Sequence, residues 1–504
     1  MTIGIWILGD RLTTKQVSLS NNQNNKNKTP IIFIESSNYV RQRPYHQQKL
    51  VLVWSAMRHF AAELKADNWQ ITYEIADDFV TPLKQWIEQN KITELQITNP
   101  CDRPFAKLIN SFDLGCKITF LADTHFLWDR DEFVDWAKSR NRLLMEDFYR
   151  AGRKKFNILM DGKKPVGGKW NYDKDNRQPP KTGLLTPPPL TFPPDAITQE
   201  VIDWVKSQNF SSYGKIEPFN WAVTRQQARE VLAHFVAECL PKFGKYQDAM
   251  VTGEYTMWHG LISPYLNLGL LEPMEVIDAV ETAYYQQELP LNSVEGFIRQ
   301  VMGWREYMHG IYYLQDENYS QNNWFNHDKP LPEFFWDSSK TEMNCLHQTL
   351  KQIEETAYGH HIQRLMILSN FALISGISPQ EIEDWFHSAF IDAYDWVMQT
   401  NVIGMGQFAD GGVLASKPYA ASANYINKMS DYCGGCKYKK TKRTGEKACP
   451  FNFFYWDFLI RHQDKLRSQG RMNLVLSHLK KMDSAESEQI RSLSREWWQN
   501  CQSR

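Results

Sequence analysis

The sequence predicts a two-domain protein in which an α/β domain with a parallel, Rossmann-like sheet precedes a large all-α domain. Over roughly the first 120 residues, short apolar segments alternate with segments of helical periodicity, which is typical of a parallel sheet covered by helices. Beyond residue 197 the helical periodicity continues and the strand-like alternation stops. Prolines between residues 171 and 195 forbid regular helix there. We therefore expect an α/β domain at 1–135, a basic segment and linker at 136–196, and an all-α domain at 197–504.

Five strands and three helices are expected in the first domain. The strands fall at 2–8, 31–35, 70–76, 94–98 and 117–122, and the helices at 49–67, 81–91 and 103–113. The first strand ends in Gly9-Asp10 without the further glycines of the dinucleotide fingerprint, so we expect no pyrophosphate bound in the Rossmann manner. A ligand at the carboxyl ends of the strands would lie near Asp10 and Glu35.

The second domain is expected to run as one helix after another. Segments with a period of 3.6 residues occupy 228–240, 273–285, 294–314, 346–369, 379–399 and 453–466. The sequence shows no internal repeat and no heptad array in this half, which favours a single globular helical domain.

Composition excludes some classes of function. The net charge of −1 creates no general attraction to nucleic acid, so DNA binding would depend on local basic segments such as 137–169 and 437–447. The alternative for such a basic run is an ordinary solvated surface. No apolar run approaches the ~18 residues of a membrane span, and the first residues do not resemble a signal peptide. We expect a cytoplasmic, monomeric protein whose cysteines stay reduced.

Three of the eight cysteines have metal-ligand spacing. Cys433, Cys436 and Cys449 form a C-x2-C-x12-C pattern, and Cys345 is the best candidate for a fourth ligand. Four thiolates bind either tetrahedral zinc or an iron–sulfur cluster, and spacing alone does not decide between them. The proline directly after Cys449 and the aromatic run that follows it favour iron.

Two motifs in the helical half suggest a bound ligand. In WHGLISPYLNLG (258–269), Ser263 and the nearby glycine offer a hydroxyl and backbone N–H groups to a phosphate, although an ordinary Ser-Pro helix start has the same pattern. In FIRQVMGWREY (297–307), polar and aromatic side chains crowd two helical turns, which an amphipathic surface would also explain. The residues of interest in that segment are Gln300, Trp304, Arg305 and Glu306.

Four further polar residues of the helical half each allow two interpretations. His360 and His361 are adjacent on the chain and cannot chelate one metal from a helix, but one of them could act as a general acid. The alternative is a surface histidine beside a core histidine. Asp395 and Asn401 stand among apolar neighbours and suit a heterocyclic ligand, or else they are satisfied by nearby backbone.

Taken together, these motifs resemble those of the photolyase/cryptochrome superfamily. The segments FIRQVMGWREY, HGLISPYL, the His360-His361 pair, NVIGMGQFADGG and DYCGGC…ACPF are similar to the iron–sulfur bacterial branch, which contains prokaryotic (6-4) photolyases and related cryptochromes. The resemblance extends over essentially the whole chain.

The resemblance implies three cofactors. FAD, in a bent conformation, would be held by the helical domain through Gly260, Leu261, Ser263, Trp304, Arg305, Glu306, Asp395 and Asn401. A [4Fe-4S] cluster would be bound by Cys345, Cys433, Cys436 and Cys449. A 6,7-dimethyl-8-ribityllumazine antenna would occupy the α/β domain near Asp10 and Glu35.

The resemblance also implies a reaction, the light-driven repair of pyrimidine (6-4) pyrimidone photoproducts in UV-damaged DNA. His361, next to His360, would supply a proton to the lesion, and Gln300 and Tyr419 would orient it. Photoreduction of the flavin would use aromatic residues as electron carriers. The expected carriers are Trp385, Tyr394 and Trp336, while Phe386 replaces a tyrosine common in the family. The alternative is a signalling cryptochrome with the same cofactors, and cyclobutane dimer repair is less favoured.

Overall fold

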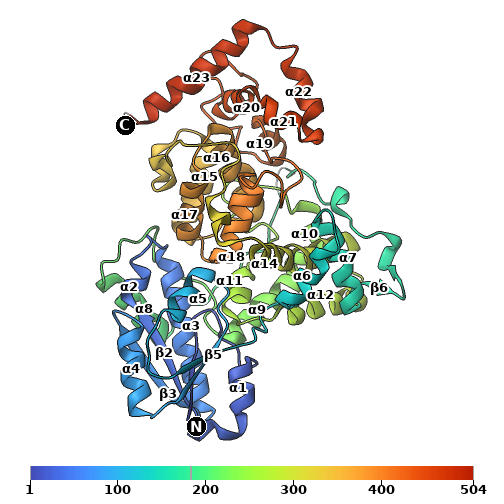
Figure 1. Cartoon of the computed structure of the whole chain (residues 1–504). Helices are drawn as coiled ribbons and strands as arrows, with labels where there is room; N and C mark the ends of the chain where they lie inside the picture. The colour runs from blue at the N-terminus through green and yellow to red at the C-terminus, as the bar shows by residue number, and fades with distance from the viewer. Residues whose placement is uncertain (1, 182–183, 503–504) are drawn as a thin grey trace.

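The computed structural model describes residues 2–181 and 184–502, and it confirms a parallel sheet followed by a helical domain (Figure 1). The strands are β1 (Ile3–Trp6), β2 (Pro30–Ser36), β3 (Gln70–Ala76), β4 (Glu94–Thr98) and β5 (Lys117–Leu121), all parallel in the order β3-β2-β1-β4-β5. The three central strands are almost wholly buried because helices cover both faces of the sheet; β1 and β2 are mostly apolar, while β4 alternates apolar and polar residues. The edge strands β3 and β5 are only partly buried.

Strand β1 is the point at which the strand order reverses. Ile5 of β1 pairs with Ile31 of β2 on one side and with Gln96 of β4 on the other. Ligands of open α/β sheets bind beyond the carboxyl ends of the strands at such a reversal. The helices of this half are α1 (Val17–Asn22), α2 (Ser37–Val40), α3 (Gln47–Ala66), α4 (Val80–Gln89) and α5 (Arg103–Asn110).

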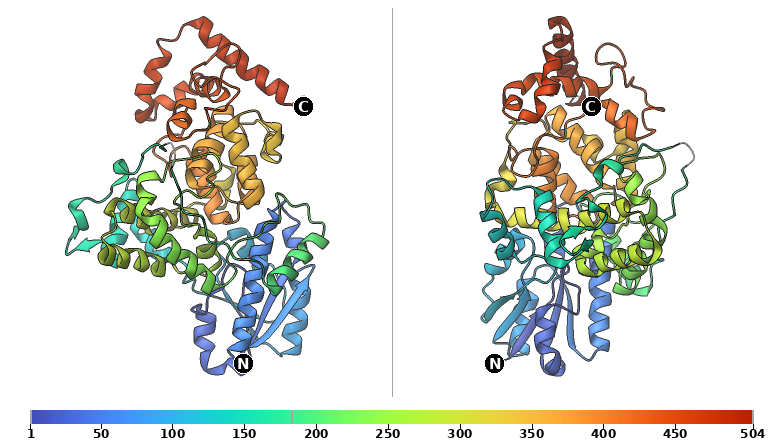
Figure 2. Two further views of the ribbon diagram at one scale, coloured as in Figure 1. Left: turned by 180° about the vertical axis from the view of Figure 1, so that it is seen from behind. Right: turned by 90° about the vertical axis from the view of Figure 1, so that its right-hand side faces the viewer.

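The remaining helices follow along the chain, and all of them except α8, which packs beside α3, form the second, larger half of the molecule (Figure 1). In order they are α6 (Arg130–Lys138), α7 (Met145–Phe156), α8 (Ala196–Ser207), α9 (Arg225–His234), α10 (Leu240–Tyr246), α11 (Ser263–Leu268), α12 (Pro273–Gln287), α13 (Leu291–Ile298), α14 (Glu306–Leu314), α15 (Asn344–Thr356), α16 (Asn370–Ser375), α17 (Pro379–Ala389), α18 (Asp395–Met398), α19 (Ala423–Met429), α20 (Pro450–Arg461), α21 (Gln463–Arg467), α22 (Asn473–Leu479) and α23 (Ser484–Gln502). Helices α20 to α23 lie at the end of the molecule opposite the sheet (Figure 2).

The segment expected to be a basic linker is only partly irregular. Residues of α7 pack against the helical half, where Gly152 approaches Met302, and a short hairpin of β6 (Met160–Asp161) and β7 (Lys164–Pro165) follows. The proline-rich stretch after residue 176 has no helix or strand among its described residues until α8. Helix α8 then returns to pack beside α3, so the core of the α/β half continues into the helical half.

Besides a short π-helical turn at 235–239, three longer stretches of the helical half are wound as π-helix, at 299–305, 363–369 and 399–406. Inserted π-turns of this kind are frequent at functional sites, because they change the direction of side chains within a continuous helix. Each stretch contains or directly follows one of the motifs singled out from the sequence.

Candidate functional sites

A buried ion pair organises the centre of the helical half. Arg364, in the second π-helical stretch, donates from Nη1 and Nη2 to the two carboxylate oxygens of Asp392 at 2.9 and 3.1 Å. Ser263, the first residue of α11, donates from Oγ to Asp392 Oδ2 at 2.6 Å. Burial acts to raise the pKa of Asp392, but Arg364 and Ser263 outweigh it and hold that pKa below its usual value. The site therefore contains a carboxylate that is charged at neutral pH.

Two histidines lie stacked in the buried interior of this half. The rings of His259 and His360 are parallel, with centroids 4.5 Å apart. His360 is 2% exposed, and neither of its ring nitrogens has a partner within the described chain; His259 Nε2 has none either. Burial, with repulsion from neighbouring cations, lowers the pKa of both rings, to about 4 for His259. Neutral buried rings with free nitrogens are unusual in a finished core, so they indicate room for a polar ligand.

His361 differs from its neighbour because it faces solvent. Surrounding protein nevertheless desolvates the imidazole, which lowers its pKa to about 4, and Arg364 adds to this effect. The pair thus combines a core residue with an accessible one, and the accessible ring is neutral at pH 7.

The Trp304–Glu306 segment braces the junction between the two halves. Glu306 accepts hydrogen bonds from the backbone N–H groups of Leu127 and Trp128 at 2.7 and 3.1 Å. Arg305 pairs with Glu306 at 2.9 Å and lies over the ring of Phe126. Burial raises the pKa of Glu306 to about 7, against the opposing effect of Arg305. These contacts fix the segment that follows β5 against α14, while Nε and Nη2 of Arg305 have no partner within the described chain.

The remaining predicted flavin contacts lie in different surroundings. Gly260 lies against the ring of Phe235, and Leu261 has a positive φ of 49°, so this turn into α11 is tightly constrained. Asn401 donates from Nδ2 to Val397 O at 2.9 Å within its own helix. Gln300, which was expected to orient the lesion, donates likewise to Gly296 O at 2.8 Å. Asp395 accepts from Gln399 and from the hydroxyl of Tyr312, and it lies next to Glu383 and His387 rather than next to Ser263.

The four predicted cysteine ligands meet around one cavity. Cys345 at the start of α15, Cys433 and Cys436 in a turn, and Cys449 at the N-cap of α20 all line it. Burial raises the pKa of the Cys345 thiol well above its usual value, and the three nearby thiols raise it further. Apolar and aromatic side chains complete the wall, among them Met343, Ile426, Tyr432 and Phe451. The donor set and its shielded setting fit a thiolate-bound metal centre.

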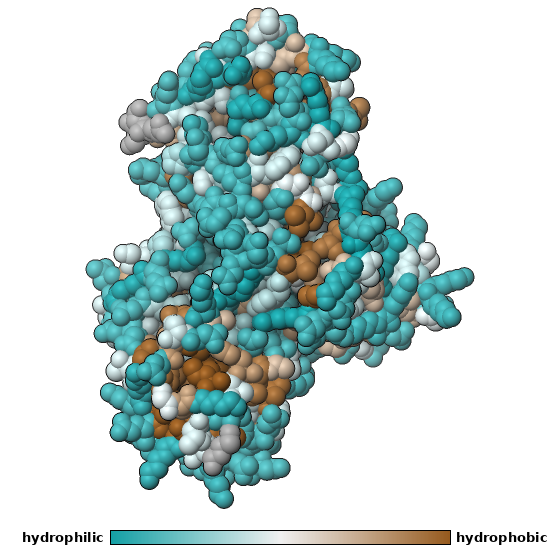
Figure 3. Space-filling model, in the orientation of Figure 1, coloured by the Kyte–Doolittle hydropathy of each residue, from teal (hydrophilic) through white to brown (hydrophobic). Residues whose placement is uncertain are grey.

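A second cavity opens at the carboxyl ends of β1 and β4, where the strand order reverses. It encloses ≈ 950 Å³, its open mouth included, and is lined on the sheet side by residues that include Asp10, Ser36 and Asp102. Apolar atoms gather on the surface of this half (Figure 3). Helix α3 contributes Lys49, whose pKa burial lowers to about 7.

Glu35 is placed away from this cavity, contrary to the expectation from the sequence. Its carboxylate accepts from Arg58 at 2.8 and 3.0 Å and from the hydroxyl of Tyr73 at 2.5 Å. Successive residues of a strand point to opposite faces, so Ser36 lines the cavity while Glu35 points to the other side.

Aromatic rings connect the buried helical core to the surface. Trp385 is 0% exposed and donates from Nε1 to Phe335 O at 2.8 Å, and Trp336 is 36% exposed. Tyr213 lies between them, with its ring centroid 6.5 Å from Trp385 and 5.4 Å from Trp336. Tyr394 instead lines the α/β cavity. Tyr213 was not predicted, because its loop carries no motif.

The protein thus joins a parallel α/β half to a helical half that holds an arginine–carboxylate pair and four facing thiols. Residues 5–221 match the family described as deoxyribodipyrimidine photo-lyase-related protein. Over 476 residues, 93% of each chain, the sequence is 44% identical to the (6-4) photolyase of Agrobacterium fabrum. The chain therefore belongs to the photolyase-related family.

Solved structures agree with this fold. A bacterial class III photolyase from Agrobacterium tumefaciens superposes with a TM-score of 0.58 at 14% identity, covering 93% of this chain and 91% of that one. A Synechocystis cryptochrome superposes with a TM-score of 0.54 at 14% identity, covering 80% and 82%. Within residues 2–181 and 184–502, no helix is both long enough and apolar enough to cross a membrane.

Proposed function

We propose that this protein reverses pyrimidine (6-4) pyrimidone photoproducts in UV-damaged DNA by light-driven electron transfer from a reduced FAD in its helical half. The observation that carries the proposal is the 44% identity, over 93% of both chains, to a protein named (6-4) photolyase. The site agrees with this assignment, because it offers a buried carboxylate–arginine pair, free histidine nitrogens and an accessible histidine at one place in the core.

The residues that would hold FAD are those around the ion pair. Ser263 and the constrained turn at Gly260 and Leu261 start α11, where backbone N–H groups suit a phosphate. Arg364 and Asp392 suit polar edges of a ring system, and Trp304 and Asn401 stand on the π-helical stretches on either side. When bound, FAD absorbs blue light and supplies the electron for repair.

His361 is the group that we assign to proton transfer, with His360 packed behind it. Its neutral ring carries one N–H that can be donated to the oxygen returned during repair. A DNA phosphate approaching the ring would raise its pKa, which would link proton donation to lesion binding. Gln300 and Tyr419 are proposed to orient the extruded dinucleotide, since a damaged base must leave the stack to reach the site. Basic side chains in 137–169 and 437–447 would contact the phosphates.

The four cysteines are proposed to bind a [4Fe-4S] cluster with a structural role. The proline directly after Cys449 and the apolar and aromatic wall around the four thiols favour an iron–sulfur centre over zinc. The cluster would join the start of α15 to the segment before α20.

The α/β cavity is proposed to hold the 6,7-dimethyl-8-ribityllumazine antenna. Asp10 and Ser36 provide polar groups at the ends of β1 and β2, and aromatic walls such as Tyr39 and Phe105 suit a flat heterocycle. Under this proposal residues 1–135 collect light and 197–504 carry out repair, in a monomeric cytoplasmic protein.

Repair of a defined lesion tests the proposed function. The purified protein, with flavin photoreduced under anaerobic conditions, is illuminated with blue light in the presence of an oligonucleotide that carries a single (6-4) photoproduct. Chromatography should show conversion to undamaged thymines in the light and none in the dark. An oligonucleotide with a cyclobutane dimer should stay unchanged. Failure to convert the (6-4) product with fully reduced FAD bound would instead support a signalling cryptochrome.

A further inference from the structure

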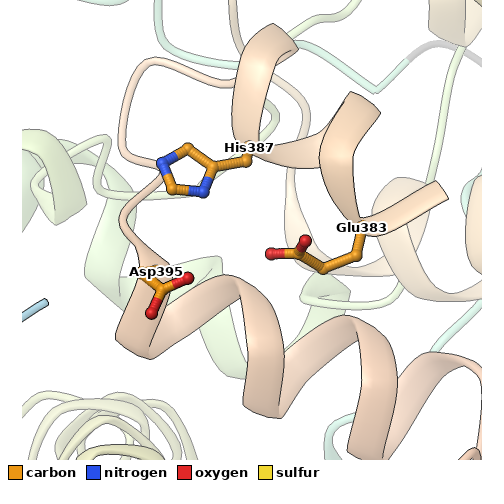
Figure 4. Close-up of side chains that lie close together, drawn as sticks. All are labelled: Glu383, His387 and Asp395. Atoms are coloured by element: carbon orange, nitrogen blue, oxygen red, sulfur yellow. The ribbon is translucent and has the colours of Figure 1, made fainter. Parts of the chain in front are cut away.

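Three buried ligand-type side chains face one another between helices α17 and α18. Glu383 and His387 are one turn apart on α17, and Asp395 is the first residue of α18. One ligand atom from each lies within 4.8 Å of those of the other two. Figure 4 shows the carboxyl groups and the imidazole pointing into a common space. The three residues are 8%, 7% and 7% exposed, so water does not freely hydrate them.

The hydrogen bonds around this cluster are incomplete. Glu383 Oε1 and His387 Nδ1 have no partner within the described chain. Asp395 accepts from Gln399 and Tyr312, and both of these donors are uncharged. A buried carboxylate without a partner is costly, and buried charges are normally paired or bound to a metal. Among the described residues, the cluster therefore has no cation in direct contact.

The nearby basic side chains do not contact the cluster directly, although the charge of Arg43 acts on Glu383 and Asp395 and that of Arg103 acts on Asp395. Arg43 pairs with Asp384, which lies on the exposed side of α17. Lys49 directs its Nζ to the carbonyl oxygens of Ala393 and His387, at 2.6 and 3.4 Å. Among the ion pairs of the described residues, none includes Glu383 or Asp395.

The geometry matches a metal site built on a helix. Residues four apart project from the same face of a helix and can bind one ion together, as two histidines do in helical zinc sites. The third ligand comes from the start of the next helix, which fixes the angle between the two elements. One imidazole nitrogen with two carboxylate oxygens suits a divalent first-row metal such as Mn²⁺, Fe²⁺ or Zn²⁺.

We propose that Glu383, His387 and Asp395 form a binding site for one divalent first-row transition-metal ion. The site is separate from the four cysteines, and the proposed repair chemistry does not use it. It lies where the helical half meets the α/β half: the ring of Tyr45 is 6.0 Å from that of His387, and Asp102 accepts from the backbone N–H of Trp396. A bound ion would tie α17 to α18 beside the α/β cavity, which His387 and Tyr394 also line.

Manganese is the appropriate probe because it prefers oxygen and nitrogen donors and leaves the thiolate site unoccupied. Full-length holoprotein is treated with EDTA, its visible absorbance is checked for loss of the thiolate-bound centre, and MnCl₂ is titrated while free Mn²⁺ is followed by electron paramagnetic resonance. Pulsed measurements then report nitrogen coupled to the bound ion. We compare the parent with Glu383→Gln, His387→Gln and the control Asp384→Asn, which changes a neighbouring exposed carboxylate.

The parent and Asp384→Asn should each bind one more Mn²⁺ than Glu383→Gln and His387→Gln. Coupling between the bound Mn²⁺ and an imidazole nitrogen should be present in the parent and Asp384→Asn and absent in the other two proteins. Mn²⁺ should raise the thermal midpoint of the parent and Asp384→Asn and leave that of Glu383→Gln unchanged. Glu383→Gln keeps the side-chain volume, so it remains informative if His387→Gln does not fold. Equal Mn²⁺ binding in all four proteins, or no nitrogen coupling in the parent, would overturn the assignment and indicate that protons alone neutralise the cluster.

Discussion

Arg364 and Asp392 form a two-pronged ion pair, with nitrogen–oxygen distances of 2.9 and 3.1 Å, between the π-helical stretch after the histidine pair and the segment before α18. Ser263, more than one hundred residues away in the sequence, completes the cluster by donating to the same carboxylate. Asp392 is buried and Arg364 is only 14% exposed, so the carboxylate depends on this arginine for its counter-ion. Three separate motifs of the helical half thus meet at one charged group.

Replacement of Arg364 by leucine should destabilise the protein strongly. It leaves Asp392 buried without a counter-ion, which typically costs about 3–5 kcal/mol. The matched control is Arg225→Leu, which breaks a partly exposed pair with Glu275 and should cost about 0–1 kcal/mol. Urea unfolding of both variants gives the comparison. Equal losses in the two variants would show that the Arg364 pair does not organise the core.

Replacement of Cys345 by serine should abolish iron binding. The buried Cys239 lies in the π-helical stretch 235–239, away from the four-thiol cavity, so Cys239→Ser is the matched control. Elemental analysis and visible absorbance of freshly purified proteins report the metal. We expect about four iron atoms per chain in the parent and the control, as a [4Fe-4S] centre requires. One zinc atom and no iron in the parent would contradict the proposed cluster.

The two acidic residues suggested for the antenna should behave differently. Asp10→Asn changes a side chain that lines the α/β cavity and should lower the amount of co-purified or reconstituted lumazine severalfold. Glu35→Gln changes a carboxylate bound to Arg58 and Tyr73, so it should lower stability and leave lumazine content per folded protein unchanged. Fluorescence of the released chromophore measures the content. Loss of lumazine in Glu35→Gln, with parental lumazine content in Asp10→Asn, would show that Glu35 and not Asp10 binds the antenna.

His46 should make the protein sensitive to acid. Burial lowers the pKa of its imidazole from 6.5 to about 4. Between those values the unfolded chain binds a proton and the folded chain does not, so stability is complete above pH 6.5 and is lost as pH falls toward 4. The contribution is about 3 kcal/mol, from a 2.5-unit shift at 1.36 kcal/mol per unit.

The effect of His46 is measured as the change in unfolding free energy between pH 7 and pH 4.5. His46→Gln should lower the number of protons taken up on unfolding, and so the slope of unfolding free energy against pH, by about one proton. Replacement of the exposed His478 by Gln should leave this slope as in the parent. An unchanged slope in His46→Gln would mean that its ring is hydrated or already charged in the folded protein.

Local signals account for what could be predicted from the sequence. Strands β1 and β2 were recognisable because a strand covered on both faces is apolar along its length, and β4 because its apolar and polar residues alternate. The cysteine site was recognisable because two of its ligands are separated by only two residues. In both cases neighbouring residues carry the information.

What could not be predicted depends on contacts between distant segments or on the face of an element. Arg364 and Asp392 look like ordinary charged residues in the sequence, and only the fold pairs them. Two possible signals were that Arg364 follows the histidine pair by three residues and that Asp392 stands within an apolar run. Glu35 points away from the cavity because successive residues of a strand face opposite sides of the sheet, and Ser36 takes the cavity side. Asp395 was grouped with the flavin by its apolar neighbours, whereas its place at the start of α18 puts it beside Glu383.

The most direct measurement is repair of a (6-4) oligonucleotide per saturating blue flash by the parent and by His361→Gln, with bound FAD quantified in both. We expect repair in the parent and at least a hundredfold loss in the variant, on the order of a general acid's contribution, with equal FAD content. Repair by His361→Gln at the parental yield would contradict the assigned proton transfer, and absence of repair in the fully reduced parent would contradict the function itself.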